Sequence, residues 1–140
     1  MKFRLLFIVL LLAAATAARA EEARLTILHT TDVHGSLTAW DYLADRPAAR
    51  GLVKLGTLVR QVRGEGQPLV LVDAGDALQG SPMQAMWRAR GDGTREPMMA
   101  AMTALGYDAM AVGNHEFDHG LDAIESARED AGFPFLAVNI

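Results

Sequence analysis

The sequence contains no cysteine, and this absence removes two kinds of chemistry. Without thiols there is no disulfide framework and no thiolate nucleophile, so any metal site must use oxygen and nitrogen ligands. The sequence also lacks a Gly-x-Ser-x-Gly elbow and a Gly-x-Gly-x-x-Gly fingerprint, which argues against serine hydrolases and dinucleotide-binding folds. Residues 75–80 have the glycine spacing of a P-loop, but Ser81 stands where that motif requires lysine.

No apolar run reaches the roughly 20 residues that span a bilayer, and the first 20 residues are predicted to be a secretory signal peptide. Lys2 and Arg4 precede an apolar run at 5–15, and residues 18–20 form an Ala-x-Ala cleavage site. An uncleaved membrane anchor is the weaker alternative. Cleavage removes three of the 13 basic residues and none of the 17 acidic ones, so the net charge falls from −4 to −7. Such a chain suits the periplasm or the cell exterior, with no remaining membrane span, and binds nucleic acid polymers poorly.

Short apolar segments alternate with helix-like segments along residues 21–140. Four segments are predicted strands because they are short, apolar and partly β-branched: 25–31, 69–72, 109–112 and 135–140. Helices are predicted between them, within 52–62, 82–106 and 121–131. The strands are continuous apolar runs, so this β-α-β-α-β-α-β order predicts an α/β fold with a parallel sheet covered on both faces and right-handed crossovers.

Three local features refine this prediction. Pro97 is expected to begin a helix that Gly106 ends, with its methionines facing the core. The polar stretch 32–50 is long enough to predict a functional or a disordered loop. The last strand reaches Ile140 without a following cap, which indicates that the sequence is truncated on its C-terminal side.

Polar clusters follow three of the predicted strands. Residues 32–35 read Asp-Val-His-Gly, residues 75–76 read Gly-Asp, and residues 113–120 read Gly-Asn-His-Glu-Phe-Asp-His-Gly. In open α/β sheets, ligands bind at the edge where the carboxyl ends of the strands meet. Three such clusters at successive strand ends indicate a site more strongly than any one of them.

Asp32, His34, Asp76 and Asn114 are the candidate metal ligands. In an extended chain, residues i and i+2 point to the same side, so Asp32 and His34 could reach one cation. Asp76 follows a glycine and could bridge two cations through its two oxygens, and Asn114 offers an amide oxygen. These donors suit Mn, Zn, Fe or Mg. Two such ions roughly 3.5–4 Å apart would activate a water for phosphoester hydrolysis.

His115 is the candidate catalytic residue, with Asp118 three residues on as its partner. A nearby carboxylate favours the charged imidazole, which could stabilise an oxyanion or protonate a leaving oxygen. Each residue also has a structural interpretation on its own. Asp76 could cap a turn, Asn114 could occupy a left-handed turn, and Asp118 could N-cap the following helix.

Other polar and aromatic residues near these clusters are less informative. His29 lies inside a predicted strand and is expected to be structural, whereas His119 is either a solvated turn residue or a neighbour of the substrate. Trp40, Asp41 and Tyr42 either shape the mouth of the site or pack over an edge.

Residues 28–35, 73–82 and 107–118 closely resemble the ordered motifs of bacterial 5'-nucleotidases and 2',3'-cyclic-nucleotide phosphodiesterases, which are calcineurin-like metallophosphoesterases. The similarity covers residues 24–140. It implies hydrolysis of nucleotide phosphoesters at two divalent metal ions, on the N-terminal half of a β-sandwich catalytic domain. The ligands and catalytic residues that it implies are Asp32, His34 and Asp76 for one metal, Asp76 and Asn114 for the other, and a His115–Asp118 dyad.

The resemblance also implies parts that lie beyond this sequence. The family takes its remaining metal ligands from a Gly-His-x-His type motif on later strands, and a C-terminal domain binds the nucleoside. The 140 residues alone are therefore expected to be inactive.

Three branches of the family stay open, as does a different class of function. Residues 79–82 and 40–52 look similar to the branch that hydrolyses 2',3'-cyclic nucleotides and 3'-nucleotides, and residues 114–118 look equally like the 5'-nucleotidase branch. A thiosulfohydrolase branch of sulfur oxidation shares the scaffold. The alternative class is a noncatalytic exported protein that binds metal or nucleotide.

Overall fold

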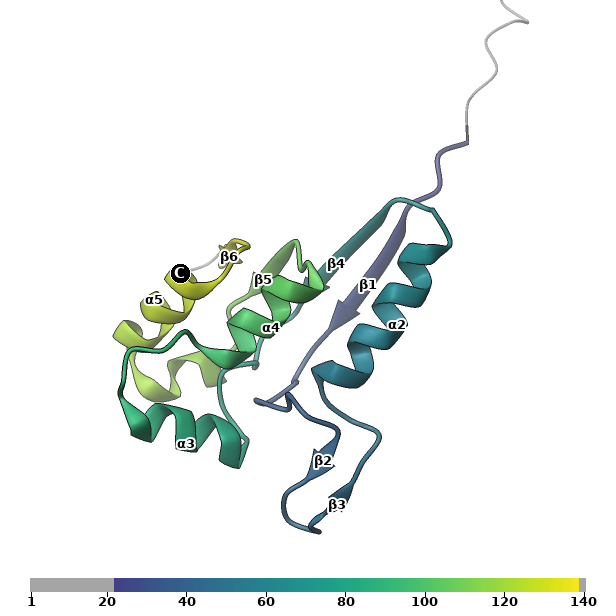
Figure 1. The fold of residues 1–140 in the computed structure, drawn as a ribbon. Coiled ribbons are helices and arrows are strands. Elements are labelled where there is room, and N and C mark those ends of the chain that lie inside the picture. The colour runs from purple at the N-terminus through teal and green to yellow at the C-terminus, as the bar shows by residue number, and fades with distance from the viewer. Residues whose placement is uncertain (1–21, 139–140) are drawn as a thin grey trace, which may run out of the picture.

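A four-stranded parallel sheet organises the molecule (Figure 1). The computed structural model describes residues 22–138, so the predicted signal peptide at 1–20 and residues 139–140 lie outside the described part. The strands follow the order β1 (Thr26–Thr30), β4 (Leu69–Asp73), β5 (Ala109–Ala111) and β6 (Phe135–Leu136). The predicted α/β class with a parallel sheet is confirmed, although β6 is shorter than the expected strand at 135–140.

The connections contain four α-helices within residues 22–138: α2 (Leu52–Gly64), α3 (Pro82–Arg90), α4 (Pro97–Leu105) and α5 (Leu121–Asp130). The interval 82–106 therefore holds two helices. As predicted, α4 begins at Pro97 and ends before Gly106, which adopts a left-handed φ of 72°. The side chain of Glu96 caps its start by accepting the Met99 N–H at 2.7 Å. None of the described helices is long and apolar enough to cross a membrane.

The helices α2, α4 and α5 lie on a single face of the sheet, with α4 in contact with the other two. Strand order equals chain order, and right-handed crossovers that always step in one direction place their helices on the same side. On this side Leu71 and Met110 are fully buried, whereas Ile27 and Leu136 on the other face are 62% and 52% exposed. Within residues 22–138, helices cover one of the two faces that were expected to be covered, because every crossover steps in the same direction.

The core fills the space between the sheet and these helices. Met98, Met99 and Met102 on α4 are fully buried and belong to one cluster with Leu71 and Met110 of the sheet. The methionines predicted from the sequence to face inward are therefore core residues. They hold α4 against β4 and β5, whose carboxyl ends carry two of the polar clusters.

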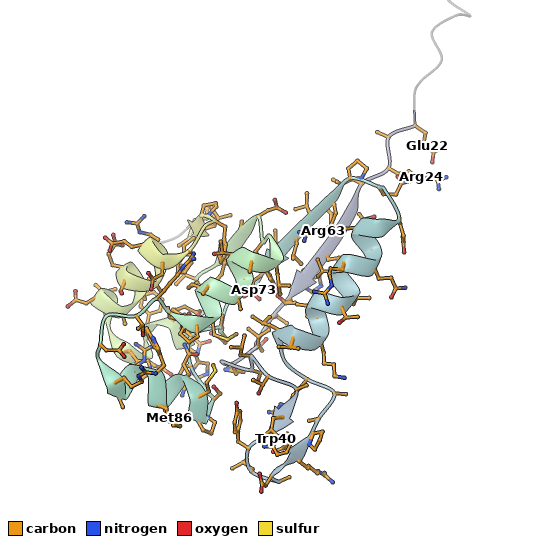
Figure 2. The ribbon with its side chains drawn as sticks, in the orientation of Figure 1. Glu22, Arg24, Trp40, Arg63, Asp73 and Met86 are labelled. Atoms are coloured by element: carbon orange, nitrogen blue, oxygen red, sulfur yellow. The ribbon has the colours of Figure 1, made fainter. Side chains whose placement is uncertain are left out.

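The long polar stretch after β1 contains a small antiparallel hairpin of β2 (Trp40–Asp41) and β3 (Arg46–Pro47). The turn is formed by the Asp41 carboxylate, which accepts the N–H groups of Leu43 at 3.0 Å and Ala44 at 3.1 Å. Of the two predictions for this stretch, disorder does not hold for the hairpin, because the side chain of Asp41 supplies local order. Figure 2 shows Trp40 on this hairpin, away from the sheet.

Candidate active site

Backbone hydrogen bonds continue past the ends of β1 and β4 and hold the first two polar clusters together. The N–H groups of Asp32, His34 and Gly35 donate to the carbonyls of residues 75, 76 and 77 at 3.1, 2.9 and 3.0 Å. The loop after β1 therefore runs beside the loop after β4. This pairing brings the first two candidate ligands next to Asp76.

Three of the four candidate ligands have a left-handed backbone. The φ angles of Asp32, His34 and Asp76 are 53°, 45° and 62°. The expectation that Asp32 and His34 share an extended segment is therefore wrong, since a turn and not a strand directs them. Non-glycine residues in this region cost about 1–3 kcal/mol each and persist only where the surroundings fix them, often at functional sites.

The ring of His34 is held in the orientation that leaves one nitrogen free. Its Nδ1 lies 3.0 Å from the Gln79 carbonyl oxygen, which can only accept, so Nδ1–H donates and Nε2 takes no part in this bond. That Nε2 lies 3.6 Å from Oδ1 of Asp32. A histidine whose second nitrogen donates to a backbone carbonyl is the usual form of a metal ligand.

Asp76 lies between the histidines of the first and third clusters. Its Oδ1 accepts the backbone N–H of His115 at 2.8 Å. One donor atom from each of His34, Asp76 and His115 lies within 4.8 Å of the others. The rings of the two histidines meet edge to face, with centroids 5.1 Å apart. The donor atoms of these three residues thus converge as a metal site requires, and their oxygen and nitrogen chemistry fits a divalent ion.

The other two candidate ligands lie at the margin of this group. Asp32 approaches His34, and its side chain is 57% exposed. Asn114 is exposed and directly precedes the 3-10 helix η1 (His115–His119), where its carbonyl accepts the Phe117 N–H. Its φ is −72°, so the interpretation of Asn114 as a left-handed turn residue is wrong.

His115 and Asp118 form an ion pair across one turn of η1. Nδ1 of His115 lies 2.7 Å from Oδ2 of Asp118. This hydrogen bond is the main cause that raises the pKa of His115 above its ordinary value, with smaller contributions from the charges of nearby carboxylates. The helix α5 has Gly120 at its N-cap without a side-chain cap, so Asp118 is not the capping residue considered above.

Glu116 is the residue of the third cluster that the sequence analysis passed over. Its side chain is 1% exposed and accepts backbone N–H groups from two separate loops. The sequence signal for Glu116 is an acidic residue inside a motif whose neighbours are candidate ligands and catalytic residues. Acidic side chains are almost never fully buried unless they are paired, so a buried one in such a motif has partners to hold.

A second buried carboxylate lies below the site. Asp73, at the end of β4, accepts hydrogen bonds from the Thr30 hydroxyl and from the Gly75 N–H, the latter at 2.8 Å. Burial raises its pKa above the ordinary value. Burial also raises the pKa of Tyr107, whose hydroxyl contacts Thr30, to about 12. Figure 2 shows Asp73 in the interior, beneath the helices.

A cleft of about 460 Å³ opens beside the site, between the hairpin and α3. Trp40, Tyr42, Gln79 and His119 line it. Gln79 is also the residue whose carbonyl orients His34. The hairpin residues therefore shape a hollow next to the candidate ligands. His29, the remaining histidine, does not line this cleft and is exposed on β1.

Gly75→Ala is expected to destabilise the fold more than a change in backbone preference explains. Gly75 has a φ of 104°, and a Cβ there would lie 2.6 Å from the backbone nitrogen of Gly113. The left-handed backbone costs about 1–3 kcal/mol, and overpacking adds about as much again. Gly66→Ala is the matched control, because Gly66 has a φ of 75° with nothing within 4 Å. Equal urea midpoints for the two variants would contradict the close approach of the loops.

The chain matches the family model of the calcineurin-like phosphoesterases over residues 25–138, and it belongs to this family. The resemblance inferred from the three motifs is confirmed. The chain is 37% identical over 128 residues to a 2',3'-cyclic-nucleotide 2'-phosphodiesterase/3'-nucleotidase of Yersinia enterocolitica, which covers 89% of this chain and 20% of that protein. It is 41% identical over 138 residues to a 5'-nucleotidase of Bos taurus, which covers 94% of this chain and 23% of that protein.

Solved structures show the same relationship. The calcineurin-like phosphoesterase YfkN of Bacillus subtilis superposes with a TM-score of 0.72 at 36% identity, covering 80% of this chain and 36% of that one. A protein named putative 5'-nucleotidase from Staphylococcus aureus superposes with a TM-score of 0.76 at 27% identity, covering 82% of this chain and 22% of that one. The chain spans about a fifth of the length of the curated relatives described above.

Proposed function

We propose that residues 1–20 are a signal peptide and that residues 21–140 are the N-terminal portion of the catalytic domain of an exported enzyme. This enzyme would hydrolyse nucleotide phosphoesters with divalent metal ions. The observation that supports this most is the convergence of donor atoms from His34, Asp76 and His115 at the ends of β1, β4 and β5. Names of the relatives support the substrate class, since they include both 3'- and 5'-nucleotidases.

The proposed ligands divide over two metal positions. Asp32, His34 and Asp76 would hold one ion, and Asp76 with Asn114 would hold the other, with Mn, Zn, Mg or Fe as candidates. Bound metals would supply an activated water and neutralise the phosphoryl oxygens. The task of the Gln79 carbonyl is to keep Nε2 of His34 available as a ligand.

His115 would assist the reaction as a cation. Its hydrogen bond to Asp118 favours the protonated ring, from which a proton can pass to the leaving oxygen of the phosphoester. A charged imidazole beside the phosphoryl group would also stabilise the negative charge that develops there. Asp118 would keep the ring oriented through this hydrogen bond.

The longer protein to which this chain is proposed to belong, called the parent protein here, would supply the parts of the active site that these residues lack. Histidines from later strands would fill the remaining metal positions, and a further domain would bind the nucleoside. We place the parent protein in the periplasm or outside the cell, on the basis of the sequence of residues 1–20. It would act on a 5'-nucleotide, a 3'-nucleotide or a 2',3'-cyclic nucleotide.

Chelation is expected to abolish hydrolysis, and Mn²⁺ is expected to restore it. The parent protein is treated with EDTA, dialysed, and assayed for phosphate release from 5'-, 3'- and 2',3'-cyclic nucleotides before and after Mn²⁺ is added. A loss of at least about a hundredfold is expected, because metal charge supplies several kcal/mol of transition-state stabilisation. Turnover that is indifferent to EDTA would contradict the metal mechanism, whereas tight metal or nucleotide binding without any turnover would support the noncatalytic alternative.

A further inference from the structure

We propose that Glu116 is a positioning residue: its buried carboxylate fastens the loop that carries Asp76 to the loop that carries His115, and so sets the geometry of the metal site. The inference rests on the proposed function for the identity of the site. It concerns a residue for which neither metal contact nor substrate contact is suggested.

The contacts of Glu116 reach both loops at once. Oε1 accepts the N–H groups of Ala77 at 2.7 Å and Leu78 at 3.1 Å. Oε2 accepts those of Asp76 at 2.8 Å and Gly113 at 2.7 Å. Each oxygen thus receives two hydrogen bonds. Oε2 is the atom that joins the two loops, because its two donors, Asp76 and Gly113, lie one on each loop. An ionised carboxylate is the only common side-chain group that can accept four N–H donors in this way without donating.

Buried carboxylates accept four consecutive backbone N–H groups of the Asp76 loop. The N–H of Gly75 donates to Asp73, and the next three, at residues 76–78, donate to Glu116. A row of neighbouring N–H groups that faces one anion is an anion nest, here occupied by the protein's own side chains. This row fixes the loop in a conformation that its sequence does not favour, because Asp76 has a left-handed φ of 62°.

The four hydrogen bonds of the Glu116 carboxylate, called the clamp below, hold the backbone of the proposed ligand Asp76. Asp76 donates its N–H to Glu116 while its own Oδ1 accepts the N–H of His115. The two loops are therefore joined twice, once through each carboxylate. Gly113 permits this approach, because a Cβ there would lie 2.3 Å from Oδ1 of Asp76 and 2.8 Å from Oε2 of Glu116. If the clamp is lost, the carboxylate of Asp76 moves relative to both histidines.

Glu116→Gln is the decisive variant, because it keeps the size of the side chain and removes half of its accepting capacity. Whichever way the amide turns, its NH₂ group faces two N–H donors that it cannot accept. Loss of a group that orients metal ligands typically lowers metal affinity by about 10- to 100-fold. We expect that loss in a calorimetric Mn²⁺ titration of the metal-depleted parent protein. We also expect faster hydrogen exchange at the amides of residues 75–78 and 113 in the metal-free state.

Glu129→Gln is the matched control, because Glu129 lies exposed on α5 and the substitution changes the net charge equally. It should leave both Mn²⁺ affinity and exchange unchanged. Glu116→Asp provides a second test in case the amide variant does not fold, since it keeps the charge and withdraws the carboxylate by one methylene. It should also bind Mn²⁺ more weakly than the wild-type protein.

The outcomes separate this inference from the proposed function. A folded Glu116 variant with wild-type Mn²⁺ affinity and wild-type exchange at residues 75–78 would overturn the positioning role. Failure of both variants to fold would also overturn it, by making Glu116 a residue of the fold alone. Absence of Mn²⁺ binding in the wild-type protein would instead contradict the proposed function, and amide exchange would still decide whether the clamp exists.

Discussion

Asp76→Asn in the parent protein is expected to lower kcat/KM for nucleotide hydrolysis by about a thousandfold or more. Asparagine keeps an oxygen that can accept the His115 N–H, which Oδ1 of Asp76 accepts at 2.8 Å. It loses the negative charge and the second carboxylate oxygen, which the proposed bridging role needs. Phosphate release measures the activity, and elemental analysis measures the bound metal, which should fall together with it.

Asp92→Asn is the control for this substitution. Asp92 lies between α3 and α4, where it bonds Thr94 and pairs with Arg90, and the chemical change is the same. It should retain activity and metal content. Full metal occupancy and near-normal turnover in Asp76→Asn would contradict the assignment of Asp76 as a bridging ligand.

His115→Ala is expected to reduce kcat by about a hundredfold to ten-thousandfold, the usual contribution of a general acid or base. Metal binding should largely persist, because the backbone N–H of residue 115 still donates to Asp76 in the variant. The contrast between lost turnover and retained metal is the result that assigns the imidazole to catalysis. Single-turnover kinetics and a Mn²⁺ titration of the same preparation provide the two measurements.

The geometry offers one competing role for the same ring. Because a donor atom of His115 lies within 4.8 Å of those of His34 and Asp76, the imidazole could act as a ligand instead. If the imidazole is a ligand, His115→Ala would show a large fall in Mn²⁺ affinity, and its turnover at saturating metal would not be lost. His29→Ala serves as the control, because His29 is exposed on β1, inside the strand rather than at its end.

The parts of the site that depend on strand ends could be predicted from the sequence. Apolar runs locate β1, β4 and β5, and parallel strands bring their carboxyl ends to one edge, where donor atoms of His34, Asp76 and His115 converge. The contact of His115 with Asp118 follows from a spacing of three residues within one helical turn. These inferences need only local periodicity and the rules of parallel sheets.

The parts that depend on contacts between loops could not be predicted. The left-handed backbone of His34 follows from a hydrogen bond between its N–H and the carbonyl of Asp76, which is remote in sequence. The role of Glu116 depends on donors 38 to 40 residues away. Likewise, the open face that exposes Ile27 follows from the direction in which successive strands are added, which no single segment encodes.

The left-handed backbone at the candidate ligands has a consequence for how this protein can be stabilised. Replacing Asp32, His34 or Asp76 with glycine would relieve the steric strain at its φ angle and would remove charge or imidazole from a crowded edge. Substitutions chosen for thermal stability alone would therefore favour loss of the proposed ligands. Under the proposed function, these positions trade conformational stability for reactivity.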